Sequence, residues 1–224
     1  MRVLAGLVPS FAFAILSAAG AAAQTPAPSN AGAGPTRGYV EAVAQSAFGN
    51  ITSQSYGGEF GTTVANDVQV FAEVGQTRNV ASADIGASAE QIAAVLRVVQ
   101  SAAVTYTVKQ PVTFGIGGVR YLIPAGSTSV RPYVLAGFGV ARVANDVKYQ
   151  FGGADASGTI AQFVTLGSDL SGTSTHAILA TGAGVAIPVW QRLVVDLQYR
   201  FGRVFADPSA IDTNRIGVGI GLRF

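Results

Sequence analysis

Along much of the chain, apolar and polar residues alternate with a period of two, which is the pattern of a half-buried β-strand. The cleanest example is the C-terminal segment 214–224, where large apolar residues at even positions alternate with Gly and Arg at odd positions. Segment 193–201 alternates in the same way, with Asp196, Gln198 and Arg200 on its polar face. The pattern predicts eight strands, at about residues 39–48, 53–64, 68–78, 110–123, 130–143, 174–187, 193–201 and 214–224.

The predicted connections between these strands alternate in length. The connections after the second, fourth and sixth strands are short, and those after the third, fifth and seventh strands are longer. The connection after the first strand, 49–52, lies at the same end as the longer ones but is short. The long connections are 79–107, 144–173 and 206–213. Within the first of them, Ser88-Ala89-Glu90-Gln91 resembles a capping box and predicts a short amphipathic helix over 88–100. This asymmetry is expected of an outer-membrane barrel with short periplasmic turns and long external loops.

Composition points to the same class. Hydrophobic residues make up 49% of the chain and charged residues only 12%, about half of the share in soluble domains. Beyond the N-terminus no run of about 18 apolar residues occurs, so the sequence predicts no membrane-spanning helix, and a closed barrel is the other architecture that satisfies every backbone group in lipid. A water-soluble β-sandwich also has alternating strands, but it does not explain long loops at one end and an export signal. We predict an all-β fold, an eight-stranded antiparallel transmembrane up-and-down barrel.

The N-terminus predicts export. Arg2 precedes an apolar stretch over 3–16, and Ala21-Ala22-Ala23 offers a small-residue cleavage site. We therefore expect a signal peptide over 1–23 that is removed, a flexible lead-in over 24–36, and the barrel over 37–224. The expected location is the outer membrane of a Gram-negative cell.

The polar faces of the strands predict a charged barrel interior. Glu59 and Glu73 are equidistant from Asn66, so hairpin pairing would place them opposite each other, and Arg120 and Arg131 are likewise symmetric about their turn. Because eight strands leave just enough room for side chains to fill the barrel, we predict a charge-paired plug. The predicted network consists of Glu41, Glu59, Glu73, Arg120, Arg131, Asp196, Arg200 and Arg223.

The segment 110–123 is ambiguous in its parity. Its apolar residues occupy even positions before Gly117 and odd positions after Gly118. Either a β-bulge at these two glycines restores the alternation, or Arg120 faces lipid.

The last eight residues, GVGIGLRF (217–224), resemble the C-terminal β-signal of outer-membrane barrels. Segments 57–61 and 131–139 are similar to strands of small OmpA-like barrel proteins. The resemblance covers about residues 37–224. It implies that the barrel assembly machinery reads Ile220, Leu222 and Phe224, that periplasmic chaperones deliver the chain, and that the folded protein is a monomer in contact with outer-membrane lipid and lipopolysaccharide.

Little else in the sequence indicates chemistry. The one histidine, His176, shares a strand face with Ser174, which leaves a lipid hydrolase as a distant alternative. The chain has no Cys, its loop acids lack the spacing of a calcium loop, and its positive charges are scattered rather than clustered with aromatic residues. We therefore expect no catalytic residues, cofactor, metal or nucleic acid.

Two functions remain from the sequence. The first is a structural or surface-interaction protein, in which the barrel anchors external loops that contact lipopolysaccharide, a host or a neighbouring cell. The alternative is a small passive pore.

Overall fold

The computed structural model describes residues 38–100, 103–124, 130–152, 154–155, 171–207 and 209–224. All of them belong to the unit 35–224. The predicted signal peptide and lead-in lie outside the described residues.

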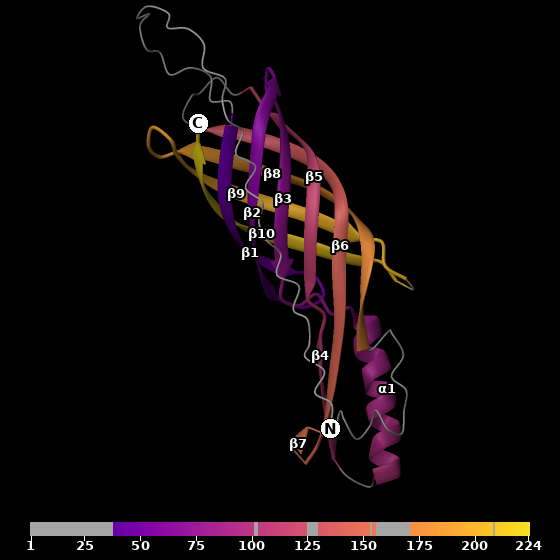
Figure 1. Ribbon diagram of the computed structural model, residues 1–224. Coiled ribbons are helices and arrows are strands. Elements are labelled where there is room, and N and C mark those ends of the chain that lie inside the picture. Colours follow the sequence, from indigo (N-terminus) through magenta and orange to yellow (C-terminus); the bar gives the residue numbers. More distant parts are fainter. Residues whose placement is uncertain (1–37, 101–102, 125–129, 153, 156–170, 208) are drawn as a thin grey trace, which may run out of the picture. The chain divides into compact units, whose positions relative to one another are not determined.

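Eight strands pair into a closed antiparallel barrel (Figure 1). Each strand pairs with its neighbours in chain order, and the first strand, β1, pairs with the last, β10, so that no edge of the barrel is left open. The predicted eight-stranded up-and-down barrel is confirmed. Its strands are β1 (Gly38–Phe48), β2 (Ser53–Ala65), β3 (Val68–Thr77), β5 (Val112–Leu122), β6 (Arg131–Phe151), β8 (Ser171–Pro188), β9 (Leu193–Val204) and β10 (Ile211–Arg223).

The two ends of the barrel differ. At one end, here called the turn end, β2 and β3 are joined through Asn66 and Asp67, and β8 and β9 are joined by residues 189–192. At the opposite end, the loop end, the connections from β3 to β5 and from β6 to β8 are long. The predicted asymmetry is present for these four connections, but the connection from β9 to β10 at the loop end (205–210) is shorter than that from β5 to β6 at the turn end (123–130).

Along each strand, alternate residues point to the outside and to the inside of the barrel. Large apolar side chains on the outside remain exposed, such as Phe60 (64%), Phe138 (61%) and Ile220 (59%). In water such an array would be costly, whereas acyl chains would cover it favourably. The inward positions carry most of the buried charged residues, so the strand pattern separates an apolar exterior from a largely polar interior.

The ambiguous strand β5 contains no bulge. Its pairing with β3 and with β6 runs without a register shift. Phe114 and Ile116 point inward and are buried together with Arg120, while Val119 and Tyr121 point outward. Both sequence alternatives were therefore wrong, because they assumed that every apolar residue of this strand faces lipid.

The helix α1 (Ala83–Gln100) begins five residues earlier than predicted. Ser82 Oγ accepts a hydrogen bond from the Ile85 N–H at 3.4 Å, so Ser82 is the N-cap and not Ser88. Asp84 lies in the first turn, where a carboxylate complements the positive end of the helix dipole.

A smaller group of a helix and strands extends from the barrel at the loop end. Most of its residues lie in the predicted connections 79–107 and 144–173. The strand β4 (Val104–Lys109) pairs with the outer part of β6, beyond the point where β6 was predicted to end at Val143. The two-residue strand β7 (Ala154–Asp155) pairs with the tip of β6. Helix α1 lies beside β4 and β6 (Figure 1). We call α1, β4 and residues 144–151 of β6 the rim projection.

The rim projection has a hydrophobic core of its own. Ala89 and Ala93 are fully buried, and small residues at these positions let the helix approach the strands closely. Asn79 joins the projection to the barrel rim, because its Oδ1 accepts hydrogen bonds from the backbone N–H groups of Ala81 and Gln110. The core consists of Ala81, Ile85, Ala89, Ala93, Leu96, Val104, Val147 and Tyr149.

Candidate functional site

Three carboxylates form a row inside the barrel. Glu59 on β2 is paired with Glu41 on β1 and with Glu73 on β3. Like charges directly opposite each other in a sheet repel, so this row requires positive partners from elsewhere. The predicted placement of Glu59 opposite Glu73 is observed, and Glu41 extends the row by one strand.

Three arginines line the other half of the barrel wall. Arg215 on β10 is paired with Arg200 on β9. The same line of cross-strand neighbours continues through Gly182 and Leu135 to Arg120 on β5. Each row would be unstable alone, and the closed barrel brings the two rows face to face.

Glu59 is the centre of the network. It is 2% exposed, and its Oε1 accepts hydrogen bonds from the Arg120 guanidinium and from the Tyr39 hydroxyl, the latter at 2.6 Å. Its Oε2 accepts from Arg200 Nη2 at 2.6 Å. One carboxylate thus compensates two guanidinium groups that are themselves almost fully buried.

The other acids are also paired with donors. Arg215 Nη1 donates to Glu73 Oε1 at 3.1 Å. The Tyr133 hydroxyl donates to Asp196 Oδ2 at 2.7 Å, and Arg120 Nη2 lies 3.7 Å from the same oxygen. Charge-assisted hydrogen bonds of this kind hold side chains in fixed positions across the interior.

Glu41 on β1 is held by an amide and by a glycine. Gln198 Nε2 donates to Glu41 Oε1 at 2.9 Å. A Cβ at Gly219 would collide with Glu41 Oε1, so glycine at this position leaves room for the carboxylate.

Aromatic rings exclude water from the arginines. The Arg120 guanidinium carbon lies 4.7 Å from the centroid of the Tyr39 ring and 4.0 Å from that of Tyr133. The Arg215 guanidinium lies 4.4 Å from the centroid of Phe114. A guanidinium that stacks on an aromatic ring keeps its in-plane N–H groups for the carboxylates. The interior is therefore a packed mixture of ion pairs and rings.

The structure brings together six of the eight predicted network residues: Glu41, Glu59, Glu73, Arg120, Asp196 and Arg200. Arg131 is exposed at the turn end, and the prediction that it opposes Arg120 was wrong. Arg120 is paired with Leu135, and Arg131 is paired with Ala186 on β8. The hairpin of β5 and β6 is centred between residues 127 and 128, whereas the symmetry of Arg120 and Arg131 assumed a centre between 125 and 126, so the register differs.

Arg223 is half-buried near the turn end. It lines a small cavity there together with Tyr39, Glu41 and Arg120. No ion pair of Arg223 occurs within the part of the chain that the structure describes.

Sequence reasoning missed several members of the network. Arg215 has the same parity as Arg223 on β10, and this signal could have identified it. Tyr39 and Tyr133 share strand parity with Glu41 and Arg131 but were not included, although a buried tyrosine hydroxyl needs a hydrogen-bond partner. Gln45 accepts from Arg215 at 3.2 Å and belongs to the same group.

The residues predicted as an assembly signal lie on the outside of β10. Ile220, Leu222 and Phe224 are 59%, 51% and 69% exposed. The backbone N–H of Phe224 donates to the Gly38 carbonyl at 3.0 Å, and the Gly38 N–H donates to the Phe224 carbonyl at 2.9 Å, so this strand closes the barrel. Recognition by the assembly machinery remains a prediction.

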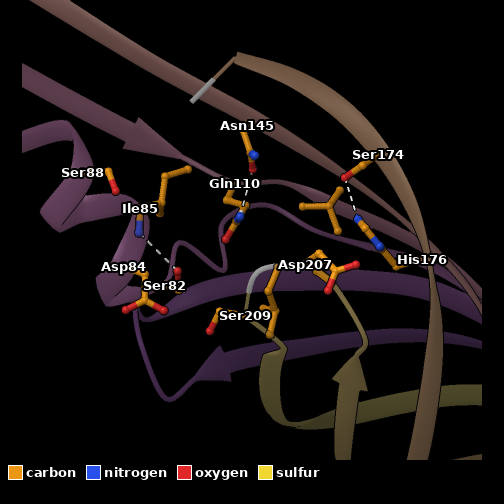
Figure 2. A pocket seen from close by; sticks show the side chains of 13 residues that line it. Ser82, Asp84, Ile85, Ser88, Gln110, Asn145, Ser174, His176, Asp207 and Ser209 are labelled. Atoms are coloured by element: carbon orange, nitrogen blue, oxygen red, sulfur yellow. Dashed lines mark hydrogen bonds between the residues drawn. The ribbon is translucent and has the colours of Figure 1, made fainter. Parts of the chain in front are cut away.

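A second candidate site lies at the mouth of the loop end. His176 Nε2 lies 2.7 Å from Ser174 Oγ, so the pair predicted to share a strand face is in hydrogen-bond contact (Figure 2). The two residues line a cavity of about 200 Å³ that Asp207 also lines. No carboxylate is hydrogen-bonded to His176 among the described residues.

Among the described residues, no group of three or more His, Cys, Asp or Glu residues is placed to hold a metal ion. Helix α1, like every helix in that part of the chain, falls short of the length and hydropathy that membrane crossing requires.

Comparison with known proteins agrees with the barrel architecture. Neisserial surface protein A covers 84% of this chain with 96% of its own, at 14% identity and a TM-score of 0.51. The N-terminal β-barrel domain of OprF from Pseudomonas aeruginosa covers 84% of this chain with 98% of its own, at 16% identity and a TM-score of 0.51. At these identities the likeness concerns the fold alone. Among curated proteins, no match was found.

The family comparison extends over nearly the whole sequence. The outer membrane protein beta-barrel domain family matches residues 10–224. This match agrees with the alternating strands, the apolar exterior and the charged interior. The chain belongs to the outer membrane protein beta-barrel domain family, and its place in the cell is the outer membrane.

Proposed function

We propose that this protein is a sealed outer-membrane barrel whose function is to present the rim projection at the cell surface. In such barrels the short turns face the periplasm and the long loops face outward. The loop end, with α1 and β4, is therefore the external end. The partner is a surface that the projection reaches from there, lipopolysaccharide or another cell.

The observation that carries this proposal is the structured rim projection itself. A loop that only connects two strands needs no hydrophobic core, yet α1 packs against β4 and β6 through a core of its own. On its solvent side the helix exposes Val95 (63%) and Val98 (81%). Exposed apolar residues on a rigid, water-facing element are typical of an interaction surface.

The sealed interior supports an anchoring role rather than transport. Glu59, Arg120 and Arg200 meet in the middle of the barrel, and each is 3% exposed or less. An ion that passes would have to separate these pairs, and separating a buried pair costs several kcal/mol.

A passive pore is the second candidate, and one observation favours it. Within the described interior, Glu73 Oε2, Asp196 Oδ1 and two nitrogens of Arg200 are buried without a hydrogen-bond partner. Buried polar atoms of this kind are usually satisfied by water, and linked waters could conduct ions.

Conductance in planar lipid bilayers separates the two candidates. The full barrel should give no steady openings. Arg120→Ala should admit ions by removing a central plug residue, whereas Arg131→Ala, which removes an exposed arginine outside the plug, should stay silent. Steady openings of the unmodified protein would favour the pore and reject the sealed barrel.

Orientation can be tested with single cysteines, because the chain has none of its own. Val98→Cys on α1 should react with a membrane-impermeant maleimide on intact cells. Asp67→Cys in the β2–β3 turn should react only after the outer membrane is permeabilised. The reverse pattern would place the rim projection in the periplasm and reject surface presentation.

A further inference from the structure

The cavity at the mouth of the loop end has features that the anchoring role does not use. Its wall combines the start of α1, the junction between β4 and β5, the outer end of β8, and the connection between β9 and β10. In Figure 2 the α1 residues lie on one side, Ser174 and His176 lie on the opposite side, and Gln110 lies between them. Because Val143 and Asn145 of β6 also line it, five separate segments contribute to one small space.

Gln110 is the buried residue of this cavity. Its side chain is 6% exposed, and its Nε2 donates to Asn145 Oδ1 at 2.9 Å, which fixes the orientation of the amide. Its Oε1 is buried without a hydrogen-bond partner, although the residue lines the cavity. A fixed carbonyl oxygen without a protein partner can accept a hydrogen bond from a donor that occupies the cavity.

The charge of the cavity specifies which donor fits. Asp84 and Asp207 line it, and none of its described lining residues is Lys or Arg. The positive end of α1 is already compensated, since Ser82 caps the helix and Asp84 lies in its first turn. The cavity therefore presents acceptors and negative charge, which disfavour an anion and favour a cation with several N–H donors.

The size of the cavity limits the occupant further. A volume of about 200 Å³ is below the range of about 300–1,000 Å³ that is usual for drug-sized ligands. The hydroxyl groups of Ser88, Ser174 and Ser209 add neutral acceptors on the wall. A short aliphatic amine satisfies both limits.

We propose that this cavity binds a small primary amine, whose ammonium group donates to Gln110 Oε1 and is compensated by Asp84 and Asp207. The inference goes beyond surface presentation and does not depend on it, because a sealed barrel and a pore would both carry the same mouth. The amine is bound non-covalently and undergoes no reaction.

Isothermal titration of the full barrel in detergent with putrescine tests the proposal. Putrescine should bind saturably, and 1,4-butanediol, which has the same length without the charges, should bind at least about tenfold more weakly. Binding should weaken with added salt, since an exposed charge pair is screened. Equal binding of the diol, or tighter binding of inorganic phosphate, would overturn the charge assignment.

Variants locate the site. Gln110→Leu and Asp207→Asn should each weaken putrescine binding several-fold, and Asp67→Asn, which removes the same charge at the turn end, should leave it unchanged. Asp207 is exposed, so its variant keeps the fold even where Gln110→Leu does not. Absence of saturable binding, or equal weakening by the Asp207 and Asp67 variants, rejects the site.

Discussion

One strand, β6, crosses both the barrel wall and the rim projection, and its exposed face changes character between them. In the barrel its outward residues include Val134, Phe138 and Val140, which are 44%, 61% and 59% exposed. In the projection the exposed residues are Asp146, Lys148 and Gln150. Beyond the exposed Arg131, the odd-numbered face is buried or partly buried, first toward the ion pairs and then toward α1. The change on the exposed face therefore marks where the surroundings of the strand change from acyl chains to water.

The two cores of the molecule are correspondingly different. Inside the barrel, charges are buried because the apolar residues are needed outside. In the projection, apolar residues are buried because water lies outside. Apolar and polar residues alternate along the strands of both regions. Whether the polar or the apolar residues are buried therefore depends on whether acyl chains or water surround the strand.

The largest expected effect comes from removing the central carboxylate. Glu59→Ala leaves Arg120 and Arg200 buried without their main partner, which should cost about 3–5 kcal/mol of unfolding free energy. Glu90→Ala, which removes an exposed carboxylate of the projection, should change it by less than about 0.5 kcal/mol. Urea unfolding in detergent, followed by the change in gel migration on heating, measures both. Equal losses in the two variants would mean that the barrel interior is not stabilised by its ion pairs.

A charge placed on the exposed face of β6 should report its surroundings directly. Phe138→Arg puts a guanidinium among acyl chains and should cost about 2–4 kcal/mol in a lipid bilayer. Gln150→Arg, on the same face of the same strand, should be nearly neutral because it lies in water. Unfolding in vesicles tests the pair. If Phe138→Arg were also neutral, this side of the barrel would not be in contact with lipid.

Much of this architecture follows from sequence because alternation determines which residues face inward. Parity alone placed Glu41, Asp196 and Arg200 in the interior. It could not give the partners of Arg120, because the register of β5 against β6 depends on the length of their connection. It also could not pair Arg215 with Glu73, since contacts across the lumen depend on the stagger of the strands around the barrel.

The strands of the rim projection were not predicted from the sequence for a different reason. Residues 144–151 alternate as a strand does, but their exposed face is polar, and they continue into a segment rich in Gly, Ser and Thr. A search for strands with an apolar exposed face therefore ends at Val143. The strand β4 has the same alternation, at Val104, Tyr106 and Val108, and most of it lies within the predicted connection 79–107.

The core of the rim projection should unfold independently of the barrel. Leu96 is 8% exposed in this core, and Leu96→Ala should cost about 2–5 kcal/mol of local stability. Because the barrel closes without α1, the heat-induced change in gel migration should persist while protease cleaves α1 faster. Val98→Ala, on the exposed side of the helix, is the matched control. Loss of the folded barrel in Leu96→Ala would show that the two cores form one cooperative unit.

The smallest effect concerns the pH dependence of the projection. Arg97 donates to both carboxylate oxygens of Glu90, at 2.7 and 3.3 Å, and to the Val104 carbonyl at 3.2 Å, so it joins α1 to β4. The hydrogen bond from Arg97 lowers the pKa of Glu90 below its ordinary value of 4.5. A lowered pKa in the folded state contributes stability that is present above pH 4.5 and is lost as pH falls through the folded value. Amide exchange in α1 of the unmodified protein should therefore accelerate slightly as the pH falls below 4.5. In the Glu90→Gln variant, which has no carboxylate to protonate at this position, exchange should lack this acceleration. Since the pair is exposed and screened by salt, the difference should shrink at high ionic strength, and a difference that survives there would point to a buried group instead.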